Sequence, residues 1–350
     1  MSQQAGIAPA GGGPALSLRV AGDALSAARY WADNTLGDAW ATAKMHALAR
    51  LDLARGDPEA ALLRYGHGIR HVKLARQSLA SYKAVDRLIK RHPDALGQYA
   101  IPAVDPKRFL FFIGYSRSGH SLVGSILDAH PNVLVSHELH ALNLFRQGRS
   151  FKDVTDAIQY NSGFFTRFGR GYMGYDYSVA DQAQGDASAL TVIGDKKANG
   201  TCAVIRRDPG IVDRLLETMP VPFSFVHVIR NPFDNIASRA KRVGTSADLA
   251  TYGYFVNVDV IDRLRKAHPG LVHDVYLDDL THDAEGVIRG LLAAIGVTDV
   301  SDAYLKACAE LVFPESRRTR GGVEWPAGFE DRIKSRLAQY DFLARFADGP

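Results

Sequence analysis

Short apolar runs alternate with helical patterns from about residue 106 onward. Four runs predict buried strands and a fifth, weaker run predicts another: 109–113, 133–135, 190–193, 223–229 and 272–277. Segments with apolar residues at helical spacing separate these runs, as βαβ units require. The pattern therefore predicts an α/β fold in which helices flank a parallel sheet. Residues 160–189, rich in Gly, Tyr and Asp, predict a long irregular insertion of the kind that often covers an active site.

The first hundred residues follow a different pattern. Residues 1–14 are rich in Gly, Ala and Pro and predict a disordered tail. Residues 15–100 have helical periodicity, and the sequence Asp57-Pro58-Glu59 has the capping aspartate and first-turn proline of a helix start. We therefore expect a helical extension ahead of an α/β domain that occupies residues 106–350.

A glycine-bounded loop joins the first predicted strand to a helix. The spacing Gly114-x4-Gly119-His120-Ser121 is that of a P-loop, which is typical of a sheet that binds nucleotides. Free backbone N–H groups and the positive end of the helix dipole make such a loop an anion cradle. However, His120 replaces the lysine that nucleotide triphosphatases need, so the loop favours a phosphate-bearing ligand other than ATP.

Polar side chains follow each of the four main strands. The carboxyl ends of parallel strands lie at one edge of a sheet, where ligands bind. We therefore expect Arg117, Arg230, the segment Ser-His-Glu (136–138) and the segment Asp-Lys-Lys (195–197) to lie together at that edge.

A second anion site is predicted beyond the fourth strand. Asn231-Pro232 has the capping asparagine and first-turn proline of a helix start. Arg230, Ser238 and Arg242 then lie close together on or before this helix. Two anion sites suit a ligand with phosphates at both ends of a nucleoside.

Two segments resemble the donor-binding motifs of the sulfotransferases, which use 3′-phosphoadenosine 5′-phosphosulfate (PAPS). They are Arg117-Ser-Gly-His-Ser and Arg230-Asn-Pro-Phe-Asp-Asn-Ile-Ala-Ser238. Residues 117–131 are similar in particular to the tyrosylprotein and bacterial branch, and residues 315–325 resemble the last cofactor-binding segment of the family. The resemblance covers about residues 106–345 and implies a P-loop-type sulfotransferase domain.

The resemblance also implies which residues hold the donor. The loop would bind the 5′-phosphosulfate, and Arg230 with Ser238 would bind the 3′-phosphate. Together with Arg242, the donor-binding residues expected are Arg117, Ser118, Gly119, His120, Ser121, Arg230, Ser238, Arg242, Ser316, Arg317 and Arg320.

For catalysis, the resemblance implies Glu138 as the general base, because it lies 21 residues beyond the loop arginine. Arg117 and Lys196 can neutralise the charge that develops on the sulfuryl and leaving oxygens. Lys197 stays open as the alternative to Lys196, and His137 or His140 as the alternative to Glu138. No metal is implied, since positive side chains and the helix terminus take its place.

We therefore expect a PAPS-dependent O-sulfotransferase. A carbohydrate or other small hydroxylated acceptor is favoured, and a peptide tyrosine is next. We expect the helical extension to form one wall of the acceptor site or to form a homodimer contact. The rivals are a P-loop kinase using ATP and Mg²⁺, which His120 argues against, and a non-catalytic nucleotide-binding protein, which Glu138 and the lysine pair argue against.

The composition indicates the class of protein and the redox environment in which it functions. Apolar residues make up 46% of the 350 residues and charged residues 23%, which is ordinary for a soluble globular protein. A net charge of +4 is too small for a protein that coats nucleic acid, but it suits an anionic cofactor. Two cysteines without paired spacing indicate a reduced, cytoplasmic setting. No signal peptide or membrane span is expected from the sequence.

Overall fold

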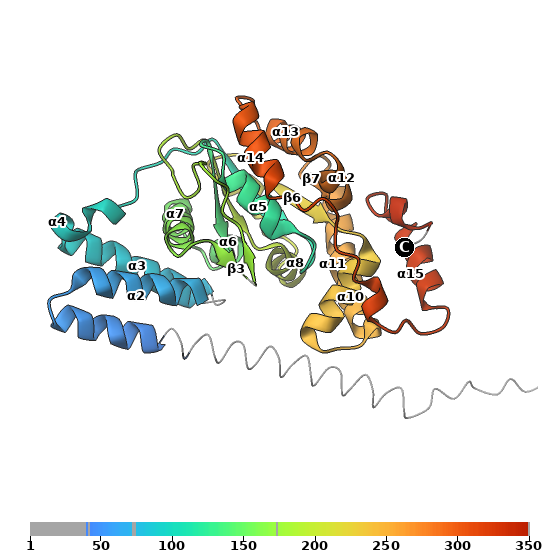
Figure 1. Cartoon of the computed structure of the whole chain (residues 1–350), viewed down its shortest axis with the longest axis horizontal. Helices are drawn as coiled ribbons and strands as arrows, with labels where there is room; N and C mark the ends of the chain where they lie inside the picture. The colour runs from blue at the N-terminus through green and yellow to red at the C-terminus, as the bar shows by residue number, and fades with distance from the viewer. Residues whose placement is uncertain (1–39, 41–42, 72–74, 173, 349–350) are drawn as a thin grey trace, which may run out of the picture.

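A five-stranded parallel sheet in the order β2-β5-β1-β6-β7 forms the centre of the molecule (Figure 1). The computed structural model describes residues 40, 43–71, 75–172 and 174–348. The strands of the sheet are β1 (Arg108–Ile113), β2 (Val133–His137), β5 (Val192–Lys196), β6 (Phe223–Ile229) and β7 (Val272–Tyr276). The predicted α/β fold and its five strands are confirmed. The predicted disordered tail lies outside the described residues.

Both faces of the sheet are buried. Along β1, Phe109, Phe111 and Ile113 join one apolar cluster, whereas Leu110 and Phe112 join the other. Successive strand side chains point to opposite faces, so a strand covered on both sides reads as an unbroken apolar run. The helices that supply the second cluster are α5 (His120–Asp128), α12 (Leu277–His282), α13 (Ala284–Ala294) and α14 (Asp302–Glu310).

The first cluster is closed by a larger set of helices. They are α6 (Ala141–Arg146), α7 (Phe151–Arg167), α8 (Ala198–Arg207), α9 (Ile211–Thr218), α10 (Pro232–Val243), α11 (Ala247–Ala267) and α15 (Phe329–Leu337). The predicted start of α10 is confirmed: the Asn231 side chain accepts a hydrogen bond from the Phe233 N–H, and Pro232 stands in the first turn.

The helical extension packs onto this first cluster. Residues 43–54 are helical and are followed by α2 (Pro58–His71), α3 (Ala75–Arg91) and α4 (Pro93–Leu96). Asp57 caps α2 as predicted, because its Oδ1 accepts a hydrogen bond from the Ala60 N–H at 2.9 Å. Leu62 of α2 and Val85 of α3 are fully buried in the same cluster as the sheet, and Figure 1 shows both helices beside α7. The extension therefore shares the core of the α/β domain.

Two expectations about local structure need correction. Residues 160–167 are not irregular, because they complete α7. A short hairpin of β3 (Gly171–Tyr172) and β4 (Tyr175–Asp176) then follows.

The third predicted strand also extends further than its apolar run. Asp195 and Lys196 lie within β5 instead of after it. The buried Asp195 carboxylate accepts hydrogen bonds from the Ser136 hydroxyl and from the backbone N–H groups of Leu139 and Ala141, at 2.8–2.9 Å. These partners come from elsewhere in the chain, so the run itself does not reveal the strand's end.

Candidate functional site

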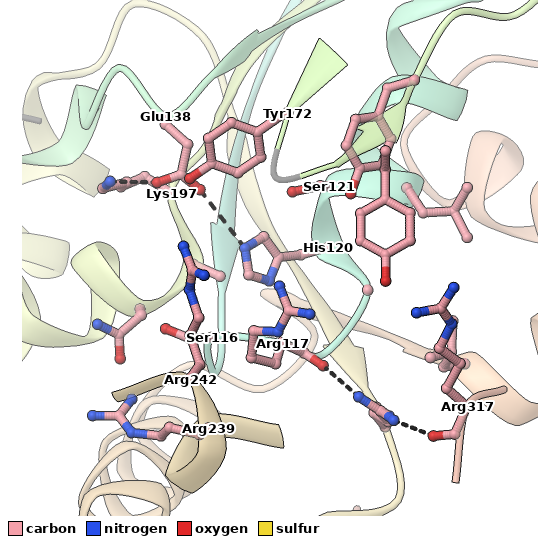
Figure 2. Close-up of a pocket in the computed structure, with 18 of the residues that line it drawn as sticks. Ser116, Arg117, His120, Ser121, Glu138, Tyr172, Lys197, Arg239, Arg242 and Arg317 are labelled. Carbon is pink, nitrogen blue, oxygen red and sulfur yellow. Dashed lines mark hydrogen bonds and ion pairs between the residues drawn. The ribbon is translucent and has the colours of Figure 1, made fainter. Parts of the chain in front are cut away.

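A cavity of about 1040 Å³ opens at the carboxyl edge of the sheet. The loop after β1, the segment after β2, the start of α8, α10 and the β3–β4 hairpin all contribute to its lining (Figure 2). Nine residues of the predicted site line it: Arg117, Gly119, His120, Ser121, Glu138, Arg230, Arg242, Ser316 and Arg317. Ser118, Lys196, Ser238 and Arg320 are not among the lining residues, and no described residue before Ser116 is either. The described part of the helical extension thus gives no support to its predicted role as a wall of the acceptor site.

The glycine-bounded loop turns sharply into α5. Gly119 has φ of +96°, and a Cβ atom there would stand 3.0 Å from Cδ1 of Leu277, so a larger residue would be strained and crowded. The Ser118 hydroxyl lies 3.1 Å from Nδ1 of His120. Burial lowers the pKa of His120, which keeps the imidazole neutral near pH 7. The loop therefore offers backbone N–H groups and a neutral ring to a ligand.

Arg117 and Arg230 connect the loop to the second predicted anion site. Nε of Arg117 donates a hydrogen bond to Oγ of Ser238 at 3.2 Å. The Arg230 guanidinium donates to the carbonyl oxygens of Arg117, at 3.3 Å, and of Arg317, and Figure 2 shows both bonds. Nε of Arg230 is buried, and no hydrogen-bond partner for it is found among the described residues. Among the described residues, this cation donates hydrogen bonds only to neutral groups, which suits a site that receives an anion.

Glu138 lies at the centre of a charged cluster. Its Oε1 is 2.8 Å from Nζ of Lys196, and its Oε2 accepts a hydrogen bond from Lys197. Nε2 of His120 lies 3.8 Å from Oε1. Burial opposes ionisation of Glu138, but the ammonium groups of Lys196 and Lys197 outweigh it and hold the pKa of Glu138 well below its usual value. The cluster also reaches the loop, because Nζ of Lys196 is 3.0 Å from Oγ of Ser121.

Three residues of this site have the left-handed backbone conformation that favours glycine. The φ angles of Arg117, Glu138 and His140 are +73°, +65° and +72°. Such conformations cost free energy and persist only where surrounding contacts enforce them. Backbone strain thus occurs at three residues that line the cavity.

The two histidines near Glu138 differ in access to the cavity. His137 stacks on Phe165, with ring centroids 4.3 Å apart, and is not a lining residue. His140 does line the cavity. Burial, helped by the charge of Lys197, lowers the pKa of His140 to about 4. Of the two alternative bases, only His140 therefore faces the space where an acceptor would lie.

The C-terminal segment, residues 315–325, contributes Glu315, Ser316 and Arg317 to the cavity lining. Oγ of Ser316 donates a hydrogen bond to Asp278 at 2.8 Å. The Arg317 guanidinium lies over the ring of Tyr175, 5.4 Å from its centroid. Arg320 points elsewhere, because its guanidinium pairs with the buried carboxylate of Asp234 at 2.6 Å. The segment is thereby fastened to the start of α10.

Several lining residues were not identified from the sequence. Tyr172, Tyr175 and Tyr177 come from the hairpin region, where the richness of the segment in tyrosine was the available signal. Arg206, Arg207 and Arg239 also line the cavity, and Arg239 lies three residues before Arg242, on the same side of α10.

Among the described residues, no group of three or more His, Cys, Asp or Glu side chains is arranged to hold a metal ion. Nor does any helix in that part of the chain combine the length and apolar character needed to cross a membrane.

The sequence matches the model of a known protein family. The model of the sulfotransferase family matches residues 110–302, which is more than half of the chain. Similar solved structures include a sulfotransferase from Mycobacterium avium, at 12% identity and a TM-score of 0.42, covering 76% of this chain and 86% of that one. A sulfotransferase from Alicyclobacillus acidocaldarius has 14% identity and a TM-score of 0.40, covering 71% and 98%. None of the curated proteins matches the chain.

Proposed function

The chain belongs to the sulfotransferase family, and we propose that it transfers the sulfuryl group of PAPS to a hydroxyl group of an acceptor. The observation that carries this proposal is the single cavity that holds the loop, Arg230 and Glu138 together. A donor bound by the loop and Arg230 would present its sulfur to an acceptor beside Glu138.

The residues present fit such a donor. The loop from Ser116 to Ser121 would bind the 5′-phosphosulfate through its N–H groups and hydroxyls. Arg230, with its unpartnered Nε, would bind the 3′-phosphate together with Ser238. Arg242, Ser316 and Arg317 border the same space. Arg320 would act indirectly, since its ion pair with Asp234 holds the C-terminal segment against α10.

The reaction is an in-line displacement. The acceptor oxygen attacks sulfur, the bond from sulfur to the 5′-phosphate oxygen breaks, and adenosine 3′,5′-bisphosphate (PAP) leaves. The acceptor proton passes to the Glu138 carboxylate as general base. Arg117 and Lys196 neutralise charge that develops on the sulfuryl and leaving oxygens, as in phosphoryl transfer.

The low pKa of Glu138 bears directly on this role. A carboxylate held between two ammonium groups is a weak base. The phosphosulfate is itself anionic and competes for Lys196 and Lys197. Binding of the donor therefore weakens the hold of the lysines on Glu138 and raises its basicity when an acceptor is to be deprotonated.

The acceptor is a hydroxylated molecule, with a carbohydrate or other small molecule favoured over a peptide tyrosine. The cavity of about 1040 Å³ is large enough for a small acceptor beside the donor.

Ligand binding and turnover test the proposal. PAP should raise the melting temperature clearly, whereas ATP with Mg²⁺ should raise it much less. Purified protein with labelled PAPS should then release PAP only when a mixture of hydroxylated acceptors is added. Stabilisation by ATP with Mg²⁺ and none by PAP would contradict the proposal.

A further inference from the structure

Three arginines of the cavity lining have no part in the proposed donor site. Arg206 and Arg207 lie in the last turn of α8 and Arg239 lies in α10, and all three line the cavity. We call these three residues the arginine wall. Helix α8 follows β5, which lies on the opposite side of β1 from β6 and Arg230. Arg206 and Arg207 therefore come from the Glu138 side of the sheet, whereas Arg239 comes from α10, which follows β6 and Arg230.

Within the part of the chain that the structure describes, no acidic side chain forms an ion pair with the arginine wall. Eight of the lining residues are Lys or Arg and only three are acidic. Of those three, Glu138 already bonds two lysines, while Asp176 and Glu315 come from the hairpin and the C-terminal segment. Among the described residues, Arg206, Arg207 and Arg239 form no ion pair.

Arg239 is the most constrained member of the wall. Arg239 is half-buried and its guanidinium rests against α11, where a Cβ atom at Gly253 would stand 3.3 Å from Nη2 of Arg239. Burial lowers the pKa of the Arg239 guanidinium. A half-buried cation without a counter-ion is costly, and an anionic ligand would offset that cost. Figure 2 shows the neighbouring Arg242 extending from α10 into the cavity, toward the side of Lys197.

We propose that the arginine wall binds an anionic group of the acceptor, namely a carboxylate, a phosphate or a sulfate ester. The acceptor is then an acidic hydroxylated molecule whose anionic group is held by the wall while its hydroxyl lies near Glu138. The inference rests on the proposed function, in which the loop and Arg230 already engage the phosphates of the donor. Planar guanidinium groups suit all three anions because they donate paired hydrogen bonds.

Three sugar probes test the wall. Glucose 6-phosphate, glucuronate and glucose share a hydroxylated ring but differ in charge. Their binding is measured calorimetrically to protein saturated with PAP, using the wild type, Arg206→Gln with Arg207→Gln, and Arg239→Gln. Lys241→Gln is the matched control, because Lys241 is an exposed cation of α10 that does not line the cavity.

We expect the wild type to bind the two anionic sugars at least about tenfold more tightly than glucose. The wall variants should lose that preference, and Lys241→Gln should keep it. Preference for a phosphate over a carboxylate, or the reverse, identifies the group that the wall takes. Equal binding of all three sugars by the wild type overturns the proposal. So does a loss of PAP affinity in the wall variants, since the wall would then serve the donor.

Failure of PAP to bind the wild type would instead contradict the proposed function. The wall is then judged from glucose 6-phosphate binding to the protein without PAP. Weaker glucose 6-phosphate binding by the wall variants supports the proposed role of the wall, and unchanged binding overturns it.

Discussion

Nζ of Lys196 lies 2.8 Å from Oε1 of Glu138, although the two residues are 58 positions apart in the chain. The pair forms because β2 and β5 are parallel neighbours, which sets the segment after β2 beside the end of β5. The Lys196 side chain is 1% exposed, so its ammonium group depends on Glu138 for a counter-charge. The ion pair thus couples the predicted base to Ser121 in the first turn of α5, which the same ammonium group contacts.

Replacement of Glu138 by Gln tests the general base. The change preserves shape but removes the proton acceptor, so turnover should fall by about 10²–10⁴-fold. PAP affinity, measured calorimetrically, should change little. Glu315→Gln is the matched control, because Glu315 also lines the cavity but is exposed and has no role in the proposed chemistry. Near-normal turnover of Glu138→Gln would move the role to His140.

The lysine pair should govern the pH dependence of PAPS-dependent kcat/KM. The pKa of Glu138 is held well below its usual value of 4.5. Protonation of Glu138 should therefore reduce the activity of the wild type only at still lower pH. Lys196→Met or Lys197→Met removes a charge that favours the carboxylate, so the pKa of Glu138 rises and the acidic limb should move to higher pH. An unchanged limb in both variants, as in the control Lys241→Met, would contradict the assignment of Glu138.

Arg230 should distinguish between donor analogues. Arg230→Ala should weaken PAP binding by roughly 2–5 kcal/mol, the usual cost of truncating one partner of a buried charge pair. Adenosine 5′-phosphosulfate lacks the 3′-phosphate, so the same substitution should weaken its binding much less. The exposed Arg263→Ala on α11 serves as control. Equal losses for the two ligands, measured by calorimetry, would show that Arg230 does not bind the 3′-phosphate.

The sequence predicts those parts of the fold that local physics determines. The five strands follow from apolar runs, and the starts of α2 and α10 follow from Asp57-Pro58 and Asn231-Pro232. The sheet order does not follow, because strand pairing depends on contacts between distant segments. The positions of Arg239 and Arg320 show the same limit. One faces the cavity and the other pairs with Asp234, and only tertiary packing decides between these outcomes.

The buried ion pair between Asp128 and Arg170 should be important for stability. Its atoms are 2.8 Å apart and its side chains are 0% and 3% exposed, and it joins the end of α5 to the residue before β3. Asp128→Asn leaves the guanidinium uncompensated and should lower the free energy of unfolding by about 3–5 kcal/mol in urea titrations. Arg289→Gln breaks an exposed pair with Asp302 and should cost about 0–1 kcal/mol. Similar losses in the two variants would contradict this reasoning.

Tyr82 should connect the helical extension to the site. Its hydroxyl accepts a hydrogen bond from Nδ2 of Asn161 at 2.9 Å, and Oδ1 of Asn161 accepts one from the backbone N–H of His137 at 2.7 Å. Tyr82→Phe leaves the buried amide without this acceptor, so the free energy of unfolding should fall by about 1–3 kcal/mol. PAP affinity should persist, because Tyr82 does not line the cavity. Tyr160→Phe is the control. The Tyr160 hydroxyl contacts Asp86, a half-buried carboxylate that water can still reach. The free energy of unfolding should therefore fall less in Tyr160→Phe than in Tyr82→Phe. If urea titrations give Tyr82→Phe the stability of the wild type, this hydrogen-bond chain does not couple the extension to the site.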